Sequence, residues 1–169
     1  DGQRGYAVGF EGLIEYVNNL LPKNEHIGAA LREDRPLFPG IAVRELVANA
    51  LIHQDMTITG AGPQIELFED RLEISNPGAT LVRPDRRIDL PPRSRNGALA
   101  SLMRRMRMCE EQGSGLDKVV QACEVFQLPA PLFRTEGDAT QAVLYGPRSF
   151  AEMTQDERVR ACYFHAVLK

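Results

Sequence analysis

The sequence predicts an α/β fold, in which helices and short paired strands share one domain. Apolar residues recur three and four apart over 10–21 and over 41–53, which is the pattern of helices with one buried face. Two β-type runs, 64–68 and 72–75, are separated only by Glu69-Asp70-Arg71, which predicts a hairpin. The chain of 169 residues is long enough to bury a proper core around these elements.

Four further segments complete the expected order: a short strand near 27–31, a helix over 97–109 capped by Asn96, a helix over 116–126, and paired strands at 132–135 and 139–145. The composition changes after Gly146-Pro147, and Thr154 is a typical helix cap. We therefore expect a domain over 1–148, and over 149–169 the start of a following helical or winged-helix segment. The opening without Met suggests a piece of a longer protein.

Composition restricts the class of protein. With 43% hydrophobic and 25% charged residues, the chain is typical of a soluble globular protein. It has no membrane-length apolar run and no signal segment, so a cytoplasmic protein with no membrane partner is expected. Cys109, Cys123 and Cys162 are too widely spaced for a disulfide framework or a metal motif. A net charge of −3 argues against chain-wide attraction to nucleic acid.

Positive charge is concentrated in one region. Residues 83–107 hold eight arginines against two acids, Asp85 and Asp89. The arginines are Arg83, Arg86, Arg87, Arg93, Arg95, Arg104, Arg105 and Arg107. Much of this region lies in a proline-rich stretch without periodicity, 79–96, which predicts a long loop, and such loops are often lids or binding loops. The arginines could be a solvated surface, a phosphate clamp or a nucleic-acid surface, and solvation is the usual case.

The helix expected over 41–53 carries a polar row. Glu45, Asn49 and His53 are four residues apart and lie one above the other on one face. If that face is buried, all three side chains need partners; if it lines a cleft, the partners can be a ligand and its metal. The alternative is a solvated helix edge with a structural histidine.

Two glycine-containing segments are candidates for ligand contact. Gly113-Ser114-Gly115 precedes a helix, where unpaired amides and the helix dipole favour phosphate, although a tight turn would look the same. In Asn76-Pro77-Gly78, Pro77 should end strand pairing and Gly78 allows a positive φ and a close approach, although this tripeptide also forms ordinary turns. Asp55 is expected to bond to a nearby turn amide.

In combination these segments resemble a known family. The motifs are Arg-Glu-Leu-Val-Ala-Asn-Ala-Leu-Ile-His-Gln-Asp, Asp-Arg-Leu-Glu-Ile-Ser-Asn-Pro-Gly, Arg-Asn-Gly-Ala-Leu-Ala and Glu-Gln-Gly-Ser-Gly-Leu. Their order resembles the GHKL or Bergerat-type ATPases: gyrase B subunits, heat-shock chaperones, MutL-type repair proteins and sensor histidine kinases. It is closer still to the divergent RecG-related or transcriptional-regulator-like ATP-binding domain, which often follows a Schlafen-type AlbA domain. The resemblance covers about 10–146.

The resemblance implies both a fold and a function. The fold is an α/β (α+β) two-layer sandwich, with a mixed β-sheet and helices packed on one face. The function is an ATP·Mg²⁺-binding regulatory module of a DNA-associated, transcriptional-regulator-like protein, with DNA bound through other domains and a homo-oligomer as one expected assembly. The alternatives are a slow ATPase and a protein- or nucleic-acid-interaction domain that binds no nucleotide.

The resemblance also implies roles for single residues. Asn49 matches the residue that binds the Mg²⁺ bridging the nucleotide phosphates, and Glu45 matches the general base of the hydrolytic relatives. Asn76 stands where those relatives carry an Asp that accepts from the adenine amino group; an Asn oxygen can accept the same bond, but the charge is lost. Gly78 matches the glycine beside the base.

The phosphate end is implied in the same way. Gly113 and Gly115, with Ser114 between them, match the second glycine box under the phosphates. Arg93 or Arg95 could reach phosphate from a lid over 79–95. The fuller glycine-rich lid of gyrase and the kinases is missing.

Overall fold

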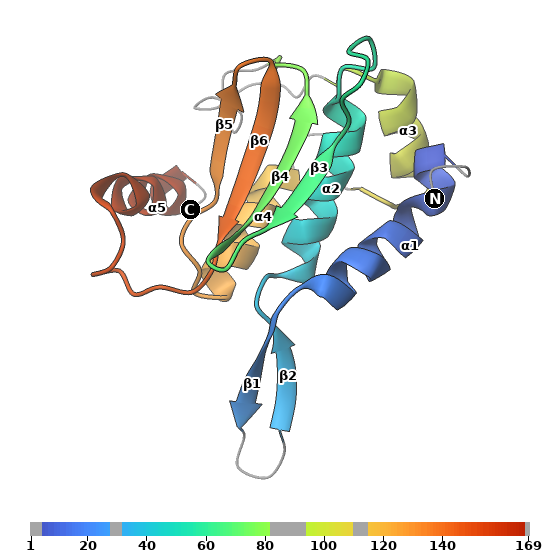
Figure 1. Ribbon diagram of the computed structural model, residues 1–169. Coiled ribbons are helices and arrows are strands. Elements are labelled where there is room, and N and C mark those ends of the chain that lie inside the picture. The colour runs from blue at the N-terminus through green and yellow to red at the C-terminus, as the bar shows by residue number, and fades with distance from the viewer. Residues whose placement is uncertain (1–4, 28–31, 82–93, 110–114, 168–169) are drawn as a thin grey trace.

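The computed structural model describes residues 5–27, 32–81, 94–109 and 115–167 (Figure 1). The elements in chain order are α1 (Gly5–Leu20), β1 (Lys23–Ile27), β2 (Arg32–Pro36), α2 (Gly40–His53), β3 (Gln64–Leu67), β4 (Arg71–Pro77), α3 (Gly97–Arg105), α4 (Gly115–Val125), β5 (Leu132–Glu136), β6 (Ala139–Tyr145) and α5 (Gln155–Val167). Within these residues, no helix has the length and apolar character needed to cross a membrane.

The molecule is built in two layers, as expected for an α+β sandwich. One layer is a four-stranded sheet in the order β3-β4-β6-β5, and α2 and α4 cover one of its faces (Figure 1). All its pairings are antiparallel, whereas a mixed sheet was expected. Short turns join β3 to β4 and β5 to β6, and only antiparallel neighbours can be joined in this way.

The core lies between the sheet and α2. Leu72 and Ile74 of β4 and Leu144 of β6 are at most 2% exposed, and their register places them on the helix side. Strand alternation explains this, since every second residue of β4 must face the same layer. The predicted helices and hairpins are therefore confirmed as the elements that form the core.

The opposite face of the sheet carries a polar network. Glu73 of β4 accepts from Arg71 Nε at 2.6 Å and from Gln141 Nε2 of β6 at 2.7 Å. The Gln141 oxygen in turn accepts from Arg134 Nε of β5 at 2.6 Å. These bonds link three strands and satisfy the buried carboxylate of Glu73, so this face needs no second layer of helices.

The strand expected near 27–31 is tested only at Ile27, which ends β1. The described residues on either side of 28–31 form the antiparallel pair β1–β2, with Lys23 opposite Pro36, and the pair projects away from the sheet (Figure 1). Residues 28–31 lie outside the described residues. A two-stranded projection covers no core, so its sequence lacks the apolar alternation by which strands are recognised.

Two helices end on residues other than glycine. Arg107 has a φ of 57° and Gln127 a φ of 56°, the left-handed conformation that usually requires glycine. In each case the following amide reaches back five residues, from Met108 to Met103 O and from Leu128 to Cys123 O, both at 2.9 Å. This is the Schellman arrangement. It ends α3 at Arg105, four residues before the end expected at Cys109.

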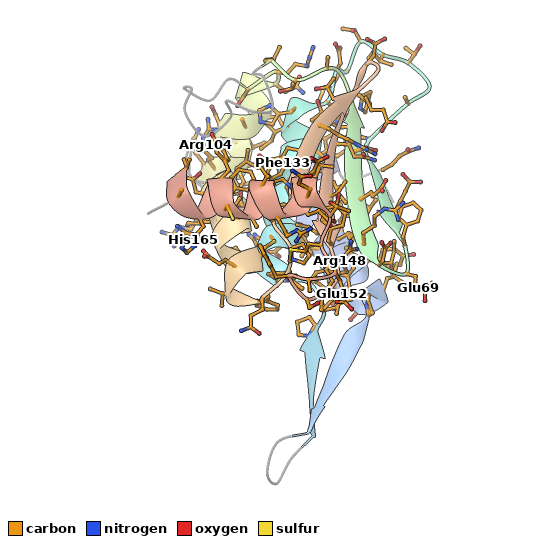
Figure 2. All side chains as sticks on the ribbon, turned by 90° about the vertical axis from the view of Figure 1, so that its left-hand side faces the viewer. Glu69, Arg104, Phe133, Arg148, Glu152 and His165 are labelled. Carbon is orange, nitrogen blue, oxygen red and sulfur yellow. The ribbon has the colours of Figure 1, made fainter. Side chains whose placement is uncertain are left out.

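The helix α5 lies beside the edge strand β5 (Figures 1 and 2). The Phe164 ring meets the Phe133 ring of β5 edge-on, with centroids 6.5 Å apart. Arg160 Nε donates to Ala130 O at 3.3 Å, and His165 pairs with Glu124 of α4. The boundary expected at 148–149 stays a prediction, with α5 in contact with the preceding residues.

The predicted cap of α5 is formed by a capping box. The amide of Thr154 donates to Glu157 Oε2 at 2.8 Å, and the amide of Glu157 donates to Thr154 Oγ1 at 3.3 Å. Thr154→Ala is expected to lower the free energy of unfolding by about 1 kcal/mol, because a helix amide loses its acceptor. Urea unfolding measures this loss. Thr59→Ala, at an exposed turn position, is the matched control and should change stability little; equal losses in the two variants would contradict the capping role.

Candidate functional site

The helix α2 is the element on which the site residues depend. It begins at Gly40, directly after Pro39, and its 14 residues are buried on several sides by the sheet, α4, α1 and α3. Glu45 is 4% exposed, whereas Asn49 and His53 are half-buried. The helix runs unbroken through all three, so they form the predicted row, about 12 Å long at 1.5 Å per residue.

Glu45 meets the start of α4. A Cβ atom at Gly115 would lie 2.7 Å from Glu45 Oε2, closer than real Cβ contacts allow. Glycine at this position therefore lets the first turn of α4 approach the carboxylate without a shift of the Glu45 side chain. The structure thus brings together two of the predicted site residues that are 70 positions apart in the sequence. Gly113 and Ser114, predicted for the same phosphate contact, lie outside the described residues.

The other end of α2 is joined to the end of β4 through Asp55. The amide of Asp55 donates to Pro77 O at 2.7 Å. Its carboxylate accepts from the Thr57 amide at 3.0 Å and hydroxyl at 2.6 Å, and from Arg95 Nη1 at 2.8 Å. The bond to the Thr57 amide confirms the predicted turn. We call Asp55, Thr57, Gly78 and Arg95 the Asp55 junction.

Gly78 is required at this junction. Its φ is +104°, and a Cβ there would lie 2.9 Å from Asp55 Cβ and 3.3 Å from Arg95 Cζ. Its amide donates to Asp138 O at 2.6 Å and its oxygen accepts from Thr140 Oγ1 at 2.8 Å. The predicted positive φ and close approach are confirmed, and the group approached is another part of the chain.

Arg95 forms hydrogen bonds at both ends of the segment 79–95. Besides Asp55, it donates from Nη2 to Ala79 O at 2.7 Å, so the two ends of the segment 79–95 are held together. Its buried Nε has no hydrogen-bond partner in the part of the chain that the structure describes. The sequence suggested Arg95 as a phosphate contact; in the structure both η nitrogens are bonded within the chain. Arg93, the other candidate, lies outside the described residues.

Asn96 does not cap α3 through its side chain, as had been expected. Its Nδ2 donates instead to Ile52 O at 2.9 Å and to Gln54 O at 2.8 Å, at the C-terminal end of α2. The last carbonyls of a helix need such donors, and here a residue more than 40 positions away supplies them. Sequence spacing could not reveal this, because an Asn before a helix usually caps the helix that follows it.

Asn76, predicted to contact adenine, lies near the end of β4 and is 6% exposed. Its Nδ2 donates to Pro77 O at 3.1 Å, the same oxygen that accepts from the Asp55 amide. The strand pairing ends at Pro77 opposite Ala139, as predicted. With its amide nitrogen bonded within the chain, Asn76 can serve a ligand through its oxygen.

The charges around the site are set by local bonds and burial. The hydrogen bonds from Thr57 hold the pKa of Asp55 below its ordinary value, so this carboxylate is ionised at neutral pH. Burial raises the pKa of Asp117, in the first turn of α4, and raises that of Cys123 to about 12. Among the described residues no group of three or more His, Cys, Asp or Glu side chains could hold a metal ion.

The fold and this arrangement define a divergent HATPase-like domain. A family model described as "Putative ATP-dependent DNA helicase recG C-terminal" matches residues 60–144, half of the chain, and the chain belongs to this family. The matched segment begins after α2 and ends at β6, so it includes Asn76, Gly78 and Gly115 but neither Glu45 nor Asn49.

The fold is also similar to that of a solved structure. The crystal structure of the DIP2311 protein from Corynebacterium diphtheriae superposes with a TM-score of 0.71 and 24% identity. The match covers 84% of this chain and 30% of that protein, so this chain spans less than a third of its relative's length. The search of curated proteins finds no match.

The contacts of Gly78 generate a prediction about stability. Gly78→Ala is expected to lower the free energy of unfolding by about 1–3 kcal/mol, because any side chain is strained at this φ and meets Asp55. Chemical denaturation checks this. Gly62→Ala, where a Cβ meets nothing within 4 Å and φ is not positive, is the control and should be neutral or slightly stabilising. A tolerated Gly78→Ala would mean that the junction is not closely packed.

Proposed function

We propose that the domain is an ATP·Mg²⁺-binding regulatory module of a larger, DNA-associated protein. The observation that carries the proposal is the contact between Glu45 and Gly115, which lies at one end of the polar row on α2, with the Asp55 junction at the other end. Asn49 lies on the same row between them. The Gly115 contact and the Asp55 junction thus lie near opposite ends of α2, and the family resemblance implies that a nucleotide contacts both ends.

The residues fit a magnesium ion held mainly by a nucleotide. Mg²⁺ in nucleotide sites takes one or two protein oxygens, with waters and phosphate oxygens supplying the rest. The Asn49 amide is a suitable single ligand, so a cluster of acidic side chains is not required. Bound Mg²⁺ would supply neutralisation of the phosphate charge. The positive end of α4, at Gly115, would favour a phosphate, and the Glu45 carboxylate that lies beside Gly115 would have to move to admit it.

The adenine end would be formed by the end of β4. The Asn76 oxygen can accept from an adenine amino group, and Gly78 exposes backbone without a side chain. The uncharged amide oxygen of Asn76 is a weaker hydrogen-bond acceptor for the adenine amino group than the Asp carboxylate of the relatives. We therefore expect a weaker preference for adenine over guanine than an Asp would give.

A slow ATPase is the second candidate, and Glu45 favours it. Its carboxylate is buried, lies one helical turn from Asn49 and contacts the start of α4. In this reading Glu45 orients a water molecule and accepts its proton. The missing glycine-rich lid and the replacement by Asn76 favour the regulatory module, because both features depart from the hydrolytic relatives.

Association with DNA is proposed for the longer protein. The family description names a DNA helicase, and this chain spans 30% of the solved relative. DNA contacts would then be made through other domains, and a homo-oligomer would be one way to couple them. A domain that binds only protein or nucleic acid is the third candidate, and the absence of any nucleotide effect on the chain would favour it.

The test of nucleotide binding is a thermal shift with ATP, ADP and GTP, each with and without Mg²⁺. A ligand that binds only the folded state stabilises it by RT ln(1 + [L]/Kd), so Tm should rise with ATP and Mg²⁺ together. Unchanged Tm values with every nucleotide, supported by calorimetry, would overturn the proposal.

Asn49→Ala tests the metal ligand. We expect ATP binding in Mg²⁺ to weaken by about tenfold or more, since a contact to a charged group contributes roughly 1.5–3 kcal/mol, and binding without metal to change little. Isothermal titration calorimetry measures both affinities. Asn19→Ala, on the exposed side of α1, is the control. Equal affinities of the parent and Asn49→Ala for ATP·Mg²⁺ would remove Asn49 from the site.

Glu45→Gln separates the enzyme from the module. The substitution keeps the shape of the side chain and removes the base, whose assistance is worth on the order of 10²–10⁴-fold in rate. For the regulatory module, phosphate release by the parent and by the variant is at background, and both bind ATP. Turnover in the parent that Glu45→Gln abolishes, at unchanged ATP affinity, would instead establish the ATPase.

A further inference from the structure

A cleft lined by arginines lies between α1, the first half of α2 and the end of α3. Its volume is about 720 Å³, within the range of small-molecule sites. Four arginines line it, Arg44 from α2 and Arg104, Arg105 and Arg107 from the end of α3, against one carboxylate, Glu45. Figure 2 shows Arg104 on α3. Among the described residues, none of the four arginines forms an ion pair with a carboxylate.

Arg44 holds the chain that lines one side of this cleft through two hydrogen bonds. Its Nε donates to Met108 O at 3.2 Å and its Nη2 to Arg107 O at 2.8 Å, while its guanidinium lies 5.6 Å from the centre of the Phe10 ring. Together with the left-handed turn at Arg107, these bonds fix the chain after α3 against α2. A defined backbone therefore places Arg104 and Arg105, in the last turn of α3, and Arg107, just after it, at the cleft.

The arrangement exceeds what the helix end alone requires. Arginines in the last turn of α3 interact favourably with the negative end of its dipole, which accounts for Arg104 and Arg105. The dipole does not account for Arg44, which comes from another helix, or for the cleft on which all four converge. The described residues that line the cleft bring four guanidinium groups and one carboxylate, so positive charge is in excess there. An anion bound in the cleft would reduce the repulsion among the guanidinium groups.

We propose that this arginine cleft binds a linear oligophosphate. Guanidinium groups match phosphate oxygens in a bidentate way, and a short oligophosphate concentrates several negative charges in a small volume. The described residues that line the cleft include no aromatic side chain, whereas single-stranded nucleic acid is usually bound by stacking on aromatic rings. The oligophosphate is either a separate anion or the phosphate tail of a nucleotide, because Glu45 borders both this cleft and Gly115.

Calorimetric titration of the whole chain with sodium tripolyphosphate, at fixed ionic strength, tests the proposal. Arg104→Gln/Arg105→Gln should weaken binding at least tenfold. The control Lys23→Gln/Arg158→Gln removes the same charge from exposed positions on β1 and α5 and should retain the parent affinity within about twofold. Absence of binding to the parent, or equal losses in both double variants, overturns the proposal. Circular dichroism checks that each variant is folded.

A measurement on the parent chain keeps the proposal falsifiable if the cleft variant does not fold. Hydrogen exchange of the peptide over 100–109 should slow when tripolyphosphate is added, and unchanged exchange overturns the proposal.

Competition between tripolyphosphate and ATP would show that the cleft binds the phosphate tail of a nucleotide. Simultaneous binding of tripolyphosphate and ATP would show that the cleft binds a separate anion, and both results support the proposal. Binding of a single-stranded oligonucleotide that depends on Arg104 and Arg105, without tripolyphosphate binding, overturns it. Tripolyphosphate binding that survives Asn49→Ala separates this site from the proposed magnesium site.

Discussion

The burial of α2 on several sides is the constraint on which the rest of the structure depends. The helix packs on the sheet, on α4, on α1 and on α3, so little of its surface is left for polar side chains. Each polar group on it must then be satisfied by a specific neighbour. This accounts for the close approach of Glu45 to Gly115, where an added side chain would require Glu45 to shift. It also accounts for the donors that Asn96 supplies to the last carbonyls of the helix.

The two ends of α2 have different chemistry as a result. Near its start, Arg44 and Glu45 border a cleft rich in guanidinium groups. At its end, the Asp55 junction joins the turn after α2, the end of β4 and both ends of the long loop.

Much of the fold followed from local patterns, and the errors have physical causes. The helices at 10–21 and 41–53 and both hairpins of the sheet were predicted because one face of each is buried. The β1–β2 pair was not predicted because it covers no core, and the end of α3 was missed because an arginine takes the left-handed position usually held by glycine. The expectation of a mixed sheet came from family resemblance, and the pairing is antiparallel throughout the described sheet.

The sequence by itself determined the helices and strands that bury an apolar face, and it indicated which residue types could bind a nucleotide. It also determined the row of Glu45, Asn49 and His53, since helical spacing alone aligns them. The tertiary structure decided which distant groups meet: Gly115 with Glu45, Arg95 with Asp55, and Arg44 with the carbonyls after α3. These contacts join residues 40 to 70 positions apart. Hydrophobic periodicity fixes the buried face of each element but carries no information about which polar groups its neighbours bring to the edge of that face.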